Sequence, residues 1–172
     1  LLIVMNRKSD LAGFLRNVAG LMFDKLGYES AGIRLKTDDG CPYVETRGFS
    51  DGFVEAGEQS CVVDQCICGR LIAGEFDPAL PFVTEYGTFW TNSTTDLLAS
   101  SNGEVFLDPM RNGCANEGYE SLALVPLKHA GDVYGLLQLS DSRREKFDSR
   151  RIEMIEGLAA NVAIGIRERI TA

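Results

Sequence analysis

A β-hairpin near the C-terminal end is the feature that most constrains how this chain can fold. Residues 118–141 read GYESLALVPLKHAGDVYGLLQLSD, and two short apolar runs flank a polar His-Ala-Gly-Asp turn at 129–132. Such a pattern is typical of two antiparallel strands joined by a tight turn. The residues expected to be buried are Leu122, Leu124, Leu127, Val133, Leu136, Leu137 and Leu139. The sequence therefore predicts an antiparallel sheet with this hairpin in it.

Apolar residues at helical spacing lie near the start of the chain, before the first predicted strand. Ser9 and Asp10 can accept hydrogen bonds from the first free amides of a helix, and Gly27 suits its end. Between them, apolar residues recur every three or four positions, at Leu11, Phe14, Leu15, Val18 and Met22. This spacing predicts an amphipathic opening helix.

A second amphipathic helix is expected after the hairpin. Asp148 can cap its start, and Phe147 with Ile152 occupies the two positions of a hydrophobic staple. An apolar stripe follows, widened by two further residues: Ile152, Ile155, Ala159, Val162 and Ile166, with Met154 and Leu158 beside them. So wide a stripe can contact the sheet and a second helix at once. The apolar stripes of the first and last helices could also be fully buried within one monomer.

Between these ends, the pattern predicts a first hairpin, a short helix and a long loop. Residues 31–36 alternate, a Thr-Asp-Asp-Gly turn follows at 37–40, and a second strand is expected over 43–49. Residues 62–73 fit a short helix that Gly74 would close. Turn-forming pairs such as Asp-Pro and Asn-Gly interrupt the whole of residues 74–117. A loop of this length inside a compact domain is usually functional.

The long loop carries an aromatic group beside short polar side chains. Its aromatics are Phe82, Tyr86, Phe89, Trp90 and Phe106, and a Thr-Asn-Ser-Thr-Thr run occupies 91–95. An apolar wall with a few polar groups is what a small-ligand pocket needs. Equally, the aromatics could plug the open face of the sheet, and the hydroxyl run could cap a short helix over 96–99.

The five cysteines are the residues of this chain that most suggest a metal or redox site. Cys61, Cys66 and Cys68 lie close together, while Cys41 and Cys114 are distant in sequence. Closely spaced thiolates can hold zinc or iron or undergo redox chemistry, whereas cysteine also packs as a small hydrophobe. On a helix, Cys66 and Cys68 would point about 200° apart, so a shared ion requires extended backbone there. Packing, redox chemistry and a thiolate-bound metal all remain open.

Composition and missing motifs exclude several functions. With 17 Lys+Arg against 25 Asp+Glu, the 172-residue chain carries a net charge of -8, which disfavours nucleic acid and anionic membrane as partners. No apolar stretch approaches the ~18 residues of a spanning helix, so one cytoplasmic domain is expected. The only histidine, His129, sits in a predicted turn, which argues against a Ser-His-Asp or Cys-His nucleophile. Walker and Rossmann phosphate motifs are absent.

The hairpin ALVPLKHAGDVYGLLQLSD, followed by Phe147 and the closing helix, resembles the C-terminal half of a GAF domain. The segments CICGR at 66–70, TFWTNST at 88–94 and CANEGYES at 114–121 are similar to a subgroup of bacterial and archaeal GAF domains joined to PAS modules and histidine kinases. The resemblance implies an α+β fold over residues 1–172. One face of a central antiparallel sheet would carry the terminal helices, and the other the short helix and long loop.

The same resemblance implies a function. A single GAF-like sensory domain, excised from a longer signalling protein that begins before Leu1, would bind a small molecule and regulate an attached PAS or histidine kinase domain. It would form a homodimer through its first and last helices and would not turn over a substrate. A reductase of free methionine sulfoxide, which is also a GAF fold and uses cysteines, and a ligandless dimerisation module are the alternatives.

The expected site follows from the motif positions that the resemblance supplies. Cys66, Cys68, Cys114, Glu117 and Tyr119 fall on recurring positions, whereas Cys41 and Cys61 match none and are expected to be bystanders. The candidate ligand-binding residues are Trp90, Thr91, Asn92, Glu117, Tyr119 and Ser121. They would surround Cys66, Cys68 and Cys114, which form the candidate metal or redox site.

Overall fold

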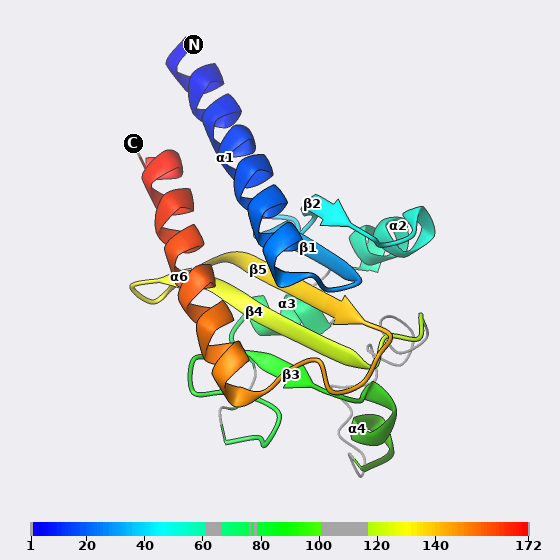
Figure 1. Ribbon diagram of the computed structural model, residues 1–172. Coiled ribbons are helices and arrows are strands. Elements are labelled where there is room, and N and C mark those ends of the chain that lie inside the picture. The colour runs from blue at the N-terminus through cyan, green and yellow to red at the C-terminus, as the bar shows by residue number, and fades with distance from the viewer. Residues whose placement is uncertain (1, 61–66, 76, 78, 101–116, 172) are drawn as a thin grey trace.

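The computed structural model describes residues 2–60, 67–75, 77, 79–100 and 117–171. Within this part of the chain the helices are α1 Leu2–Leu26, α2 Asp51–Ser60, α3 Ile67–Ile72, α4 Thr94–Ser100 and α6 Ser149–Thr171. The strands are β1 Ser30–Leu35, β2 Tyr43–Arg47, β3 Phe89–Thr91, β4 Ser121–His129 and β5 Asp132–Asp141. They form one five-stranded antiparallel sheet in the order β2-β1-β5-β4-β3 (Figure 1). The expected α+β class is confirmed.

The predicted hairpin is the centre of this sheet. β4 and β5 pair from Ser121 opposite Asp141 to His129 opposite Asp132. Ala130 and Gly131 form the two-residue turn, with φ angles of 52° and 86°. Two successive positive φ values are the geometry that matches the right-handed twist of two paired strands. The turn predicted from the polar residues at 129–132 is therefore confirmed.

Alternation along the two strands sends side chains into two separate cores. Towards the terminal helices, which we call the first face, β4 and β5 present Ala123, Val125, Leu127, Leu137 and Leu139. Towards α3, which we call the second face, they present Leu122, Leu124 and Leu136. Each of these residues is at most 1% exposed, so the hairpin is buried on both sides.

The terminal helices cover the first face and run antiparallel to each other (Figure 1). They meet where the Phe14 ring lies over Gly165, so closely that a Cβ at Gly165 would overlap the ring. The guanidinium of Arg169 lies 4.0 Å from the centroid of the same ring and pairs with Asp10 at 3.3 Å. A small residue and a cation-π contact thus hold the two helices together. None of the described helices is long and apolar enough to cross a membrane.

Local signals place the ends of the terminal helices. The Asp148 carboxylate accepts a hydrogen bond from the amide of Arg151 at 2.7 Å, and Phe147 and Ile152 are both buried, as a hydrophobic staple requires. Gly27 ends α1 with a φ of 69°. The Asp148 cap, the staple and Gly27 are confirmed. The expected start of the first helix is wrong, because α1 begins at Leu2 and Ser9 and Asp10 lie within it.

The middle of the chain contains more regular structure than the sequence predicted. Strand β3 and helix α4 lie within the supposed long loop. The Ser93 hydroxyl accepts a hydrogen bond from the Asp96 amide at 3.1 Å, so the hydroxyl run does cap a helix. Helix α2 was missed, although Ser50 caps it by accepting from the Phe53 amide at 3.1 Å. The predicted helix over 62–73 appears as α3, and residues 62–66 lie outside the described part.

Two glycines of α6 test the contact between the terminal helices. Gly165→Ala should lower the free energy of unfolding, because the new methyl group displaces the Phe14 ring. Gly157→Ala is the matched control, since no atom lies within 4 Å of its Cβ position. It should raise the free energy of unfolding by about 1 kcal/mol through helix propensity alone. Urea denaturation would measure both, and equal stabilisation by the two substitutions would contradict the close packing.

Candidate functional site

A row of buried polar side chains crosses the second face of the sheet. Ser30 and Arg34 of β1 and Gln138 and Ser140 of β5 form this row, and none is more than 3% exposed. The strand register explains the arrangement, because Ser30 lies opposite Ser140 and Arg34 opposite Leu136. Alternation then points all four side chains away from the terminal helices. Buried polar groups need partners, so each contact of this row is informative.

One end of the row is tied to the edge strand β2. The Tyr43 hydroxyl donates to the Gln138 side-chain oxygen at 2.6 Å. The Arg34 guanidinium lies 3.8 Å from the centroid of the Tyr43 ring and donates through Nη1 to the Cys41 carbonyl at 2.8 Å. Burial strengthens a cation-π contact because water no longer competes for the cation. Arg34 therefore links the sheet to the segment that leads into β2.

At the other end of the row, three hydroxyls gather. The hydroxyl oxygens of Ser30 and Tyr119 lie 2.7 Å apart and share a hydrogen bond. Ser140, opposite Ser30, is fully buried, and its Oγ has no hydrogen-bond partner among the described residues. Leaving a buried hydroxyl without a partner costs about 1–3 kcal/mol. Ser140 is thus a polar group that a bound molecule could satisfy.

Aromatic rings lie beside the row. Phe49 stacks on Phe53 with 4.9 Å between ring centroids, and the edge of Tyr119 meets both rings at 5.9 and 6.0 Å. Gly32 leaves room for this group, because a Cβ there would lie 2.9 Å from the Tyr43 ring and 3.2 Å from Phe49. We call the polar row together with Tyr43, Phe49, Phe53 and Tyr119 the second-face cluster. It combines flat apolar surface with hydrogen-bonding groups.

The described cysteines both lie in the apolar core next to this cluster. Cys68 of α3 is a buried thiol, and Cys41 is buried and disulfide-bonded. Cys41, which matched no motif position, is thus covalently bonded and is not a lone core thiol. Cys61, Cys66 and Cys114 lie outside the described residues. Among the residues that are described, no group of three His, Cys, Asp or Glu side chains could hold a metal ion.

Trp90 lies on the opposite side of the sheet from Tyr119. Its half-buried ring packs against Phe147 at 6.5 Å between centroids and belongs to the core under the terminal helices. Strand alternation is the reason, because Trp90 pairs with Ala123 on the first face while Phe89 pairs with Leu124 on the second. Trp90 and Tyr119 therefore do not line one common pocket.

Asn92 and Ser121 hold loops together. The Asn92 side chain donates to the Phe147 carbonyl at 2.9 Å and accepts from its amide at 3.0 Å. Ser121 donates to the Arg143 carbonyl at 2.7 Å. Both contacts fix the segment that leads into α6. Their side-chain groups are therefore engaged within the protein itself.

The remaining two candidates lie apart from the second-face cluster. Thr91 accepts from the Ser93 amide at 3.2 Å and donates to its carbonyl at 3.1 Å, which forms the turn into α4. Glu117 is exposed in a turn. Of the predicted site residues that the structure describes, Tyr119 belongs to the second-face cluster and Cys68 to the adjoining core. Sequence reasoning missed Ser30, Arg34, Gln138 and Ser140.

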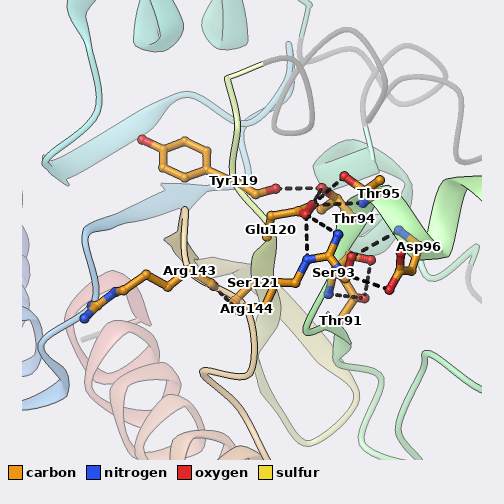
Figure 2. Close-up of polar contacts among 10 residues, drawn as sticks. All are labelled: Thr91, Ser93, Thr94, Thr95, Asp96, Tyr119, Glu120, Ser121, Arg143 and Arg144. Carbon is orange, nitrogen blue, oxygen red and sulfur yellow. Dashed lines mark hydrogen bonds and ion pairs between the residues drawn. The ribbon is translucent and has the colours of Figure 1, made fainter.

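Glu120 anchors the start of α4 (Figure 2). Its carboxylate accepts from the Thr95 amide at 3.0 Å, from the Thr94 and Thr95 hydroxyls at 3.0 and 2.8 Å, and from Arg144 at 3.1 Å. Burial raises the pKa of this carboxyl, but the hydrogen bonds and the Arg144 charge together lower it below its ordinary value. Arg144 also pairs with Asp96 at 3.2 Å. This network fixes the segment that leads from Tyr119 into β4.

Asp141 fixes the end of β5 in a similar way. It is fully buried and accepts from the Glu29 amide at 3.3 Å, and from the Arg143 amide and guanidinium at 2.9–3.0 Å. Burial alone would raise its pKa, yet these donors lower the pKa below its ordinary value. The carboxylate therefore stabilises the fold above the ordinary carboxyl range, and this contribution is lost as the pH falls.

Asp141 gives a testable pH dependence. Asp141→Asn should lower the free energy of unfolding at pH 7, and the difference from wild type should shrink as the pH falls below about 4, where the carboxylate becomes protonated. Denaturant titrations at several pH values would measure this. Asp39→Asn, in an exposed turn, is the control and should leave the pH profile unchanged. A difference that stays constant down to pH 2 would contradict the assignment.

A substitution of Asn92 tests whether this residue stabilises the fold or is available to bind a ligand. Asn92→Ala should cost about 1–3 kcal/mol in the free energy of unfolding, because it leaves the Phe147 amide and carbonyl without their partner. Urea denaturation measures this loss. Asn161→Ala, at an exposed position of α6, is the control. Unchanged stability of Asn92→Ala would show that the hydrogen bonds between Asn92 and Phe147 do not stabilise the fold.

Comparison with known proteins supports the same architecture. The model of the GAF domain family matches residues 10–166. The fold is similar to the GAF domain region of a protein assigned as a membrane protein from Geobacter sulfurreducens PCA, at 18% identity and a TM-score of 0.68, covering 95% of this chain and 97% of that one. No match was found among curated proteins.

Two further similar structures differ in function. One is a domain of a protein assigned as a two-component sensor histidine kinase from Sinorhizobium meliloti 1021, at 16% identity and a TM-score of 0.60, with 91% and 90% of the chains covered. The other is a type II free methionine-R-sulfoxide reductase from Thermoplasma acidophilum, at 10% identity and a TM-score of 0.62, with 94% and 95% covered. At these identities the likeness extends to the fold alone.

Proposed function

Because this chain belongs to the GAF domain family, we propose that it is a sensory domain that binds a small molecule at the second-face cluster. The observation that carries the proposal is the fully buried Ser140 hydroxyl, which has no hydrogen-bond partner among the described residues. A ligand that accepts or donates a hydrogen bond there would remove the cost of this unpaired group. The stacked rings of Phe49 and Phe53 favour a ligand with a flat apolar part.

A contact route from this cluster to α6 supports a sensory role. Phe82 and Phe89 meet edge to face at 5.6 Å beside the second-face core. In the same segment, the hydroxyls of Thr84 and Thr88 donate to Oε2 of Glu156 on α6 at 2.7 and 2.5 Å. A shift of this segment on ligand binding would therefore move a carboxylate of the last helix. An attached output domain, such as a histidine kinase or a PAS module, would receive that movement in the cytoplasm.

Ser140 and Ser30 form a matched pair for testing the ligand site. Ser140→Ala removes an unpaired buried hydroxyl, so the free protein should be as stable as wild type or more stable. Ser30→Ala breaks the hydrogen bond to Tyr119 and should cost about 1 kcal/mol. In a thermal-shift screen of small metabolites, compounds that stabilise wild type should stabilise Ser140→Ala much less. Equal shifts in both proteins would contradict a ligand contact at Ser140.

The exposed apolar side chains of α1 and α6 support a homodimer through these helices. Leu21 is 65% exposed and Leu158 37%, and both line an apolar hollow of about 330 Å³ between the two helices. A second copy of the chain would remove this surface from water. Val162 also lines the hollow but is itself only 7% exposed, so a charge there would disrupt the monomer core.

Charges on the exposed residues therefore test the dimer. Leu21→Glu together with Leu158→Glu should shift the protein towards monomer, because unpaired charges would be buried in the interface. Val44→Glu, at an exposed position of β2, is the control and should leave the assembly unchanged. Light scattering measures the mass, and a wild-type protein that stays monomeric at high concentration would contradict the dimer.

The disulfide at Cys41 favours thiol chemistry as a second candidate. Cys41 and the Cys68 thiol both lie in the core beside the second-face cluster. Redox sensing, metal binding by thiolates and reduction of free methionine sulfoxide would each use cysteines of this core. An absorption spectrum with metal analysis, on protein purified without oxygen, detects a bound metal. Consumption of methionine sulfoxide with a dithiol reductant would indicate a reductase, whereas a sensor would leave it unchanged.

A further inference from the structure

A second hollow lies across the sheet from the second-face cluster. It has a volume of about 540 Å³ and is formed by the segment before β3, β3 itself and the first turns of α6. Its lining residues are Thr84, Glu85, Tyr86, Trp90, Ser149, Ile152, Glu153 and Glu156. The volume falls within the range of small-molecule sites, about 300–1,000 Å³.

Two aromatic rings that are held in place line this hollow. Trp90 is half-buried and packs edge to face against Phe147. The hydroxyl of Tyr86, also half-buried, donates to the Pro126 carbonyl at 3.2 Å. The Nζ of Lys128 lies 4.4 Å from the centroid of the Tyr86 ring, so one face of this ring is already occupied by an ammonium group and Trp90 is the ring that can meet a cationic ligand. Fixed rings lose little freedom when a ligand packs against them.

The charged residues of the lining are all acidic. Glu85, Glu153 and Glu156 contribute carboxylates, and no Lys or Arg is among the lining residues that the structure describes. Glu156 is held in one orientation, because the hydroxyls of Thr84 and Thr88 both donate to its Oε2. The remaining two carboxylates are exposed at the rim. The hollow therefore joins aromatic faces to negative charge.

We propose that this hollow is a second ligand site and that it binds a small organic ammonium ion. An alkylammonium group is attracted to the negative face of an indole or phenol ring, and its attraction grows as water is excluded. The carboxylates favour the positive charge, while the half-buried ring of Trp90 contacts the alkyl groups. An anion or a neutral molecule of the same shape would gain neither attraction. The site shares no residue with the second-face cluster, although Thr84 and Glu156 of its lining lie on the contact route from that cluster to α6.

Trp90 makes the site directly measurable, because it is the only tryptophan of the chain. Choline chloride, titrated at constant ionic strength, should change the Trp90 fluorescence with saturation. The neutral isostere 3,3-dimethylbutan-1-ol should bind about tenfold more weakly, which corresponds to about 1.4 kcal/mol. Sodium chloride at the same concentration is the blank and should give no saturable change.

Two substitutions on α6 complete the test. Glu153→Gln removes a carboxylate of the hollow and should weaken choline binding several-fold, whereas Glu168→Gln, exposed near the end of the same helix, should leave it unchanged. Both positions are exposed, so neither variant should unfold, and thermal denaturation checks this. The proposal is overturned if choline gives no saturable response, if the neutral isostere binds equally well, or if the two variants bind choline alike.

Discussion

Burial of the β4–β5 hairpin on both faces is the constraint on which the rest of the structure depends. Its alternating leucines form two cores at once, one under the terminal helices and one under α3. A side chain that changes face would have to leave one core for the other, so the register is strongly fixed. Each neighbouring strand inherits that register. The division into a first face packed by long helices and a second face with a polar row follows from it.

Hydrogen bonds from three polar side chains fix the chain segments that lie beside the start of β4 and the end of β5. Glu120 holds the start of α4, Asn92 holds the chain before α6, and Asp141 holds the end of β5. All three meet backbone amides that no strand or helix satisfies, and a charged or amide oxygen is well suited to such donors. The polar residues of this region thus stabilise connections, while the polar groups that could meet a ligand lie deeper, on the sheet itself.

The sequence predicted what depends on local pattern. The apolar periodicity, the polar turn at 129–132 and the staple at Phe147 identified the central hairpin and the closing helix. Strand β3 has only three residues and is a strand because it pairs with β4, which local propensity cannot show. For the same reason Trp90 could not be assigned to a face. Ser140 and Gln138 alternate with leucines and resemble solvent-facing residues, and only the covering elements bury them.

The central claim is that the second-face cluster binds the sensed small molecule, while the β4–β5 leucines on the first face only pack against the terminal helices. Methyl NMR of the protein, with a compound that stabilises it thermally, tests this most directly. The account predicts that shifts concentrate at Leu122, Leu124 and Leu136, which face α3, and are small at Leu137 and Leu139 beneath the helices. Shifts confined to the methyl groups of Leu137 and Leu139 would contradict it.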